Sequence, residues 1–129
     1  MRFRAHDLYV LLGGKLPYTV GIDLERHDAW TLFHGNRVVG CAGTMVMWRG
    51  RHLAWAYFNR DSGGHMVAVT RHTLAKLSLL RGRVEMTVQK DFVMGQKWAR
   101  MLGFEIETPL LRAYGPDGED HVGYVKFQE

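Results

Sequence analysis

A short glycine-containing loop carries the clearest chemical signal in this sequence. It reads Phe58-Asn59-Arg60-Asp61-Ser62-Gly63-Gly64-His65 and lies between a predicted strand and a predicted helix. A helix start presents unpaired backbone N–H groups and the positive end of the helix dipole, and glycines ahead of it let the backbone wrap round an anion. The loop therefore predicts a phosphate or pyrophosphate site. The alternative, which the stretch alone favours, is a plain turn with Ser62 or Asp61 as helix N-cap.

The elements around this loop follow from the hydrophobic pattern. Alternating and apolar runs predict strands at 29–33, 38–48 and 53–59, joined by turns into an antiparallel meander. Apolar residues at helical spacing predict a helix over 65–80, and alternation predicts a strand over 84–88. The last strand of the meander, this helix and strand 84–88 form a βαβ unit. We expect its two strands to run parallel with a right-handed crossover.

The C-terminal segments complete the sheet. We expect a second helix over 92–102, extended segments at 104–108 and 110–114, and a closing strand at 121–127. This closing strand is the expected edge of the sheet, and so a candidate surface for a homodimer. The order of elements predicts one α+β domain over residues 1–129. Its central sheet is expected to be mixed and mostly antiparallel, with helices on both faces.

The N-terminal part gives weaker signals. Alternation at Phe3 and Ala5 predicts a short strand, and Asp7 is placed to cap a helix over Leu8–Leu12. Residues 15–28 read as loop, with one short helix as an alternative. Basic residues precede the five apolar residues of Leu8–Leu12, but a signal peptide needs about 7–15, so we expect a protein of the cytoplasm.

Composition narrows the class of protein. The chain has 129 residues, 47% hydrophobic and 23% charged, which excludes a disordered tail, a coiled coil and a collagen-like chain. A single cysteine excludes an internal disulfide framework, and Cys41 is expected to be a small core residue rather than a nucleophile. Seven histidines show no metal-binding spacing, so no metal site is expected. The apolar run Val38–Trp48 is far shorter than the ~20 residues that span a bilayer, so no membrane partner is expected.

The charge balance bears on the partner. Seventeen Lys and Arg against 13 Asp and Glu leave a net charge of +4, which favours an anionic partner. The basic residues are scattered rather than clustered, and this weakens the case for a nucleic-acid binder of another α+β fold. We keep a nucleic-acid binder as one hypothesis, to be weighed against two others given below, but nucleic acid is not the expected partner.

The element order and two motifs resemble the GNAT superfamily of N-acyltransferases over nearly the whole chain. The family's acyl-CoA loop reads Arg/Gln-x-x-Gly-x-Gly/Ala. In this sequence Arg60 and Gly63 match the first two defined positions, and His65 stands where the family has glycine or alanine. The family's leucine-glycine-phenylalanine signature stands complete at Leu102-Gly103-Phe104. Ala99 occupies the position, four residues before that glycine, of a tyrosine that often serves as general acid. The resemblance implies the GNAT fold, with acetyl-CoA as cofactor.

Within the superfamily, the chain also resembles the short GNAT-like proteins of podophages, including a small internal virion protein. The likeness lies in the aromatic strand 53–59, the basic helix after it and the tryptophan of the last helix. It implies a phage gene whose product acts on a host or virion protein, in the cytoplasm of the host.

The resemblance also implies where the chemistry takes place. Strands 53–59 and 84–88 are expected to splay apart and hold the pantetheine arm by backbone hydrogen bonds, and an N–H near Tyr57 or Phe58 is expected to hold the thioester carbonyl. A base must take the proton of the amine, and strand 53–59 contains no carboxylate. The remaining candidates for acid and base are Tyr57, Glu85 and Tyr124, with His34 and His65 further alternatives. The expected cofactor-binding residues are Phe58, Asn59, Arg60, Ser62, Gly63, Gly64, His65 and Lys97.

Two hypotheses follow from the resemblance. The first is an N-acetyltransferase that moves acetyl from acetyl-CoA to an amine of a protein, such as a host protein, or of a small molecule. The second is a GNAT-fold protein that has lost turnover and acts by binding a host or virion protein. His65, Ala99 and the carboxylate-free strand motivate the second hypothesis.

Overall fold

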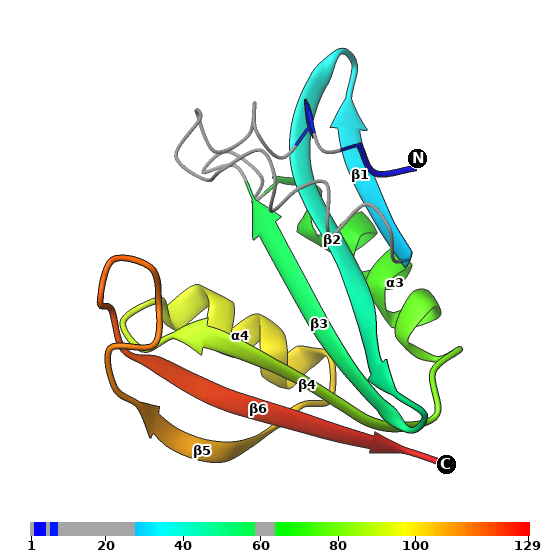
Figure 1. The fold of residues 1–129 in the computed structure, drawn as a ribbon. Helices are drawn as coiled ribbons and strands as arrows, with labels where there is room; N and C mark the ends of the chain where they lie inside the picture. The colour runs from blue at the N-terminus through cyan, green and yellow to red at the C-terminus, as the bar shows by residue number, and fades with distance from the viewer. Residues whose placement is uncertain (1, 5, 8–27, 59–63) are drawn as a thin grey trace. The chain divides into compact units, whose positions relative to one another are not determined.

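The computed structural model describes residues 2–4, 6–7, 28–58 and 64–129. Six strands form one mixed sheet in the order β1-β2-β3-β4-β6-β5, and two helices follow β3 and β4 (Figure 1). This confirms the predicted α+β fold with a mixed sheet. The elements are β1 (Asp28–His34), β2 (Arg37–Trp48), β3 (Arg51–Phe58), α3 (Met66–Leu77), β4 (Gly82–Gln89), α4 (Val93–Met101), β5 (Glu105–Leu111) and β6 (His121–Gln128).

The chain divides into two compact units, each with its own core. The first takes in Met1–Val46 and Ala54–His72, and the second takes in Met47–Leu53 and Thr73–Glu129. Because β3 and α3 cross the division, each contributes residues to both units.

The first unit contains the predicted meander. β1 pairs antiparallel with β2 from Asp28↔Thr44 to His34↔Arg37, and a bulge lies between Leu32 and Phe33. Six consecutive residues of β2, starting at Val39, are buried. This burial explains why the strand has a continuous run of mostly apolar residues rather than an alternating pattern. The core gathers around Phe3 and Cys41, and the half-buried side chains packed against it are Ala29, Val38, Met45, Trp55 and Tyr57.

The N-terminal residues join this unit through β1. Arg2 makes an isolated antiparallel bridge to Trp30, and the Phe3 N–H donates to the Ala29 carbonyl at 3.3 Å. The Phe3 side chain is buried, as its place in an alternating pattern predicted. Ala5, the predicted helix Leu8–Leu12 and the predicted loop up to residue 27 lie outside the described residues.

The second unit is built on β4 and β6, which pair antiparallel over their whole length from Gly82↔Gln128 to Gln89↔His121. Alternate residues on both strands point into the core, as the period of a strand requires. Val84 and Val88, on one face of β4, are both buried. Val122 and Tyr124, on one face of β6, are buried as well, and so is Val125 on the other face.

The predicted edge strand is not at the edge. β6 lies between β4 and β5, and β5 is the outer strand on this side of the sheet. One strand, β5, replaces the two extended segments predicted at 104–108 and 110–114, and residues 112–114 lie beyond its end. Its pairing with β6 is interrupted by two irregularities. Pro109 lies inside β5, as suits an outer strand. A homodimer through β6 is therefore wrong as predicted, because both sides of β6 are already paired.

Both helices are shorter than predicted. α3 ends at Leu77 rather than at 80, because the next two turns tighten through bonds such as Leu80 N–H to the Leu77 carbonyl at 3.0 Å. The strands on either side of α3 run parallel, as predicted for a βαβ unit. No helix among the residues placed by the structure is long and apolar enough to cross a membrane.

Candidate functional site

The described part of the predicted anion-binding loop consists of Gly64 and His65, directly before α3. Gly64 and His65 form a tight turn that leads into the helix, and Gly64 is exposed. A Cβ placed on Gly64 would meet no atom within 4 Å. Asn59, Arg60, Ser62 and Gly63, the other predicted loop ligands, lie outside the described residues. The predicted anion site is therefore described only at Gly64 and His65.

His65 lies against a second histidine. The rings of His65 and of His34, at the end of β1, are 4.6 Å apart between centroids with 35° between their planes. Sequence reasoning treated His65 as a bulky departure from the acyl-CoA loop. The structure instead brings together two of the predicted alternative bases, at the start of the long helix.

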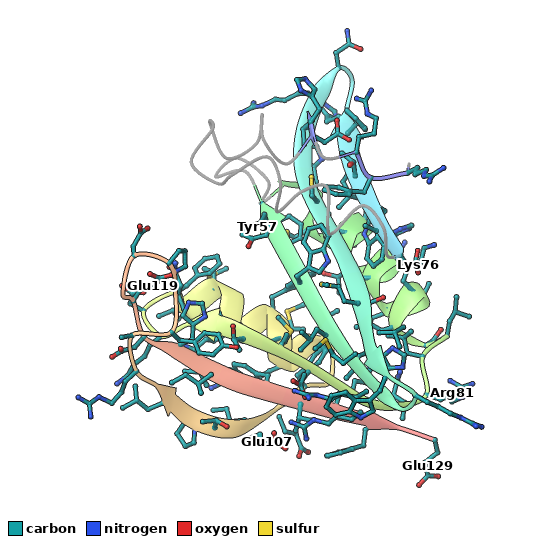
Figure 2. All side chains as sticks on the ribbon, viewed as in Figure 1. Tyr57, Lys76, Arg81, Glu107, Glu119 and Glu129 are labelled. Carbon is teal, nitrogen blue, oxygen red and sulfur yellow. The ribbon has the colours of Figure 1, made fainter. Side chains whose placement is uncertain are left out.

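The C-terminal end of β3 holds Tyr57 and Phe58 in the first unit. Tyr57 is half-buried and its ring lies 5.9 Å from that of Trp55, so burial raises the pKa of the Tyr57 phenol. The Phe58 ring occupies the space beside Gly40 of β2, where no side chain fits. Tyr57 is labelled at this end of β3 in Figure 2.

The pairing of β3 with β4 is short. It runs parallel from Arg51↔Arg83 to Leu53↔Glu85, a register of three residue pairs. β4 continues for four further residues, to Gln89, and these pair with β6 on its other side. In the pairings among described residues, the segment Met86–Gln89 has no strand partner on the β3 side.

Glu85, a predicted base, is held by two arginines of the second unit. Arg51 Nη2 donates to Glu85 Oε1 at 2.6 Å and Arg83 Nε donates to Oε2 at 2.5 Å. Arg83 also pairs with Glu107 of β5, which is labelled in Figure 2. The bond from Arg51, and then that from Arg83, lower the pKa of Glu85 below its ordinary value. A carboxylate so stabilised accepts a proton less readily than an isolated one.

Tyr124, the third predicted acid or base, is 1% exposed. Its hydroxyl donates to Gln96 Oε1 of α4 at 2.9 Å, which fastens the helix to β6. Lys97, predicted to meet a CoA phosphate, is exposed on the same helix. Gln96 and Lys97 are neighbours in sequence, and the helical period turns one inward and the other to solvent.

The leucine-glycine-phenylalanine signature forms the end of α4. Gly103 has a φ of +93°, its N–H donates to Arg100 O at 2.9 Å, and the Phe104 N–H donates to Ala99 O at 3.0 Å. These two bonds make a Schellman motif. Leu102 and Phe104 are both buried on either side of the glycine, so the signature serves the fold. Ala99 is fully buried and offers no acid.

Three polar side chains that sequence reasoning missed come together in the second unit. Thr87 Oγ1 of β4 lies 2.9 Å from His121 Nδ1 of β6, and His121 Nε2 lies 3.3 Å from Glu119 Oε1. Figure 2 shows Glu119 in the loop between β5 and β6. The one signal in the sequence was the spacing of Glu119 and His121, two residues apart at a strand start. Thr87 is 34 residues away and only the strand register brings it near.

Cys41 lies in the core of the first unit, as predicted. It is fully buried, and its Sγ is 3.9 Å from the hydroxyl of Thr31. Burial, which outweighs that contact, raises the pKa of the Cys41 thiol to about 12. Few thiolates therefore form near neutral pH.

We expect Cys41 to resist alkylation in the folded protein. Iodoacetamide at pH 8 should leave it unmodified by mass spectrometry, while the same reagent in 6 M guanidinium should modify it fully. This unfolded sample, assayed at equal reagent concentration, controls for the reactivity of the thiol itself. Rapid modification of the folded chain would contradict the burial that the structure shows.

Comparison with known proteins identifies the fold. No family model and no curated protein matches the sequence. Ard1 from Thermoplasma volcanium matches in structure with a TM-score of 0.82 at 16% identity, over 100% of this chain and 96% of that one. The ribosomal-protein-S18-alanine N-acetyltransferase from Escherichia coli matches with 0.73 at 18% identity, over 94% and 85%. A GNAT-family acetyltransferase from Streptococcus pneumoniae matches with 0.72 at 14% identity, over 97% and 93%.

These matches confirm the predicted fold class. The mixed six-stranded sheet and its helices have the GNAT acyl-CoA N-acyltransferase fold, whose solved neighbours are acetyltransferases. At these identities the likeness is one of fold, so the activity of this chain is argued from its own residues below.

Proposed function

We propose that this protein is an acetyl-CoA-dependent N-acetyltransferase that acts on an amine of a protein or of a small molecule. One observation carries the proposal: in a chain with the GNAT fold, β4 extends from Met86 to Gln89 beyond its last pair with β3. Backbone N–H and C=O groups on an unpaired strand edge accept an extended ligand as an added strand. A pantetheine arm has the amide groups to form such a strand.

The start of α3 supports the same proposal. In the described part of the loop, Gly64 is exposed, and a Cβ on it would meet no atom of the described residues within 4 Å. There the backbone N–H groups and the helix dipole favour a diphosphate. We propose the remaining loop ligands as the sequence predicts them, and Lys97 as a partner for a further phosphate. The predicted set is Phe58, Asn59, Arg60, Ser62, Gly63, Gly64, His65 and Lys97.

Bound acetyl-CoA supplies a thioester, and the protein must take a proton from the attacking amine. Tyr57, Glu85 and Tyr124 stay proposals for this step. Among them, Glu85 is ionised but satisfied by two arginines, and Tyr124 is buried with its hydroxyl bonded to Gln96. Tyr57, at the end of β3, has a raised pKa and so suits a proton donor better than an acceptor.

The acceptor is proposed from the resemblance to podophage proteins. We propose an amine of a host or virion protein, met in the host cytoplasm, with a small-molecule amine as the alternative. Neighbours such as the ribosomal-protein-S18-alanine N-acetyltransferase support a protein acceptor for this fold.

A second function, binding a host or virion protein without turnover, has one observation in its favour. Ala99, near the end of α4, is fully buried and has no acidic group at the position where the resemblance implies a general acid. A protein of this kind need not bind acetyl-CoA, so cofactor binding separates the two functions.

Isothermal titration with acetyl-CoA tests the proposed transferase. Gly64→Glu should weaken binding at least about tenfold, because a carboxylate at the start of α3 repels a diphosphate. Gly64 has room for a side chain and no positive φ, so the folded state should be retained, as circular dichroism can check. Gly64→Gln, nearly the same size without charge, is the matched control and should bind more tightly than Gly64→Glu.

Two results would count against the transferase. If the wild-type chain shows no heat at millimolar acetyl-CoA, the proposal is wrong and the binding function is favoured. If Gly64→Glu and wild type bind equally, acetyl-CoA does not approach the start of α3.

A further inference from the structure

Thr87, His121 and Glu119 form a chain of polar contacts across the second unit. Thr87 Oγ1 lies 2.9 Å from one imidazole nitrogen of His121, and Glu119 Oε1 lies 3.3 Å from the other. The side chains of His121 and Glu119 are 15% and 23% exposed, and the Tyr114 ring lies 5.3 Å from the imidazole. A hydroxyl, an imidazole and a carboxylate in this order are the parts of a proton relay.

The direction of the hydrogen bonds follows from the carboxylate. Glu119 also accepts a bond from the Asp117 N–H at 2.9 Å. Its own backbone N–H first, and then His121 and Asp117, lower the pKa of the Glu119 carboxyl. An ionised carboxylate only accepts hydrogen bonds, so His121 Nε2 carries the hydrogen that it donates to Glu119. In the neutral imidazole Nδ1 is then an acceptor, and the Thr87 hydroxyl donates to it.

Thr87 stands on the part of β4 that extends past β3. Glu85 is the last residue of β4 in the register with β3, and Thr87 follows two positions later on the same face of the strand. The proposed pantetheine edge begins at Met86. Thr87 therefore belongs to the same stretch of β4 as the proposed cofactor edge, and its hydroxyl contacts His121 of β6.

The geometry points to Thr87, His121 and Glu119 as the relay that accepts the proton of the attacking amine. This inference rests on the proposed N-acetyltransferase function and supplies the base that strand β3 lacks. The base in this inference is the relay and not Glu85, because the Glu85 carboxylate is already paired with Arg51 and Arg83.

The step balances without another reactant. The amine nitrogen bonds to the acyl carbon, the carbon–sulfur bond breaks, and the electron pair of that bond leaves on sulfur. The amine proton passes to Thr87 Oγ1 while the Thr87 hydroxyl proton passes to His121 Nδ1. The imidazolium so formed is paired with Glu119. Return of that proton, through Thr87, to the departing thiolate restores the starting state.

The alternative is that the three side chains only stabilise the loop between β5 and β6, since Glu119 also accepts a hydrogen bond from the Asp117 N–H. Two-dimensional NMR of the full chain with ¹⁵N-labelled histidine separates the two. His121, assigned with the His121→Gln variant, should be the Nε2–H tautomer, and its signals should shift when acetyl-CoA is added to saturation. His52, whose ring is held by the Arg81 carbonyl at 3.2 Å, is the internal control and should not shift.

The outcomes distinguish the relay from the transferase. If acetyl-CoA binds by titration but the His121 signals stay where they are, the relay is wrong and the proposed function stands. If acetyl-CoA does not bind at all, the proposed function fails and the relay fails with it. A protonated Nδ1 in the neutral imidazole would also overturn the relay, because Thr87 could not donate to it.

Turnover gives a second readout, with poly-L-lysine as the amine and thiol release as the signal. Thr87→Val, nearly isosteric, should lower kcat about 100-fold, the lower end of what a general base contributes, and Thr87→Ser should restore most of the rate. Glu119→Gln should also lower kcat, because the imidazolium formed in the step then has no carboxylate partner in Glu119. Equal rates for wild type and Thr87→Val would contradict the relay.

Discussion

Replacing Gly82 with alanine is expected to lower the free energy of unfolding by about 2–5 kcal/mol. Gly82 opens β4 with a φ of +94°, and a Cβ there would stand 2.5 Å from the carbonyl oxygen of Gly50 and 2.9 Å from its Cα. Positive φ strains any residue with a side chain, and the atoms in the way belong to backbone that cannot rotate aside. Strain and overlap therefore add.

The consequence reaches the candidate site through the strand pairing. The Arg83 N–H donates to the Gly50 carbonyl at 2.8 Å, next to the register in which Arg51 faces Arg83. A displaced Gly50 carbonyl would disturb the start of the short β3–β4 ladder. We therefore expect Gly82→Ala to weaken acetyl-CoA binding at temperatures where it remains folded.

Urea denaturation followed by circular dichroism measures the change in stability. Gly50→Ala is the matched control: its φ of +88° is similar, but a Cβ there meets nothing within 4 Å. It should cost only the backbone strain, about 1–2 kcal/mol. Equal losses in the two variants would show that the close approach of Gly50 to Gly82 contributes nothing.

The fold was largely predictable because its elements are encoded locally. The apolar run of β2, the helical spacing ahead of Leu77 and the glycine that ends α4 are each readable over a few residues. The leucine-glycine-phenylalanine motif was recognised from the sequence alone. The structure shows why it needs glycine: Gly103 has a positive φ, and two backbone hydrogen bonds end α4 there.

The order of the last two strands was not encoded in this local way. The closing strand was a candidate edge for dimerisation. Yet Val122, Tyr124 and Val125 are all buried, and a strand with buried residues on both faces is typical of the interior of a sheet. Pro109 in the preceding strand was the available signal for the outer position.

The candidate site was predictable only in part. Residues with a local signature, such as the loop before α3 and Glu85 in its strand, could be named. The contact of Thr87 with His121 depends on the antiparallel register of β4 and β6, which pairs Gln89 with His121. No spacing along the chain expresses that register. Arg51, which bonds Glu85 from another strand, was hidden for the same reason. Arg83 stands two residues before Glu85 on the same strand, so its contact with Glu85 could have been predicted from the sequence.

Removing the buried carboxylate of Asp7 is expected to destabilise the first unit by about 1–3 kcal/mol, the cost of leaving buried partners unsatisfied. Asp7 is 1% exposed and accepts bonds from Thr31 Oγ1 at 2.8 Å, Arg4 Nη2 at 2.9 Å and the Arg4 N–H at 3.1 Å. Asp7→Ala leaves the Thr31 hydroxyl in the core without this acceptor. Urea denaturation at pH 7 measures the loss.

The same carboxylate makes stability depend on acid. Burial raises the pKa of Asp7, but the bonds from Arg4 and Thr31 outweigh it, so the pKa lies below the ordinary value of 3.8. Because the folded pKa is depressed, the stabilisation is fully present above the unfolded pKa of about 3.9 and is lost as pH falls through the folded pKa. Stability measured from pH 6 to pH 2 should therefore fall more steeply below about pH 4 in wild type than in Asp7→Ala.

Thr31→Val provides the control, because it keeps the volume of Thr31 and removes only the hydroxyl that bonds Asp7. If the two groups act through their mutual bond, the double variant Asp7→Ala/Thr31→Val should lose less stability than the sum of the single variants. Additive losses, together with equal acid slopes for wild type and Asp7→Ala, would show that Asp7 does not hold the N-terminal residues to β1 through Thr31. In that case the backbone bond from Phe3 to Ala29 and the burial of the Phe3 ring would have to account for that attachment.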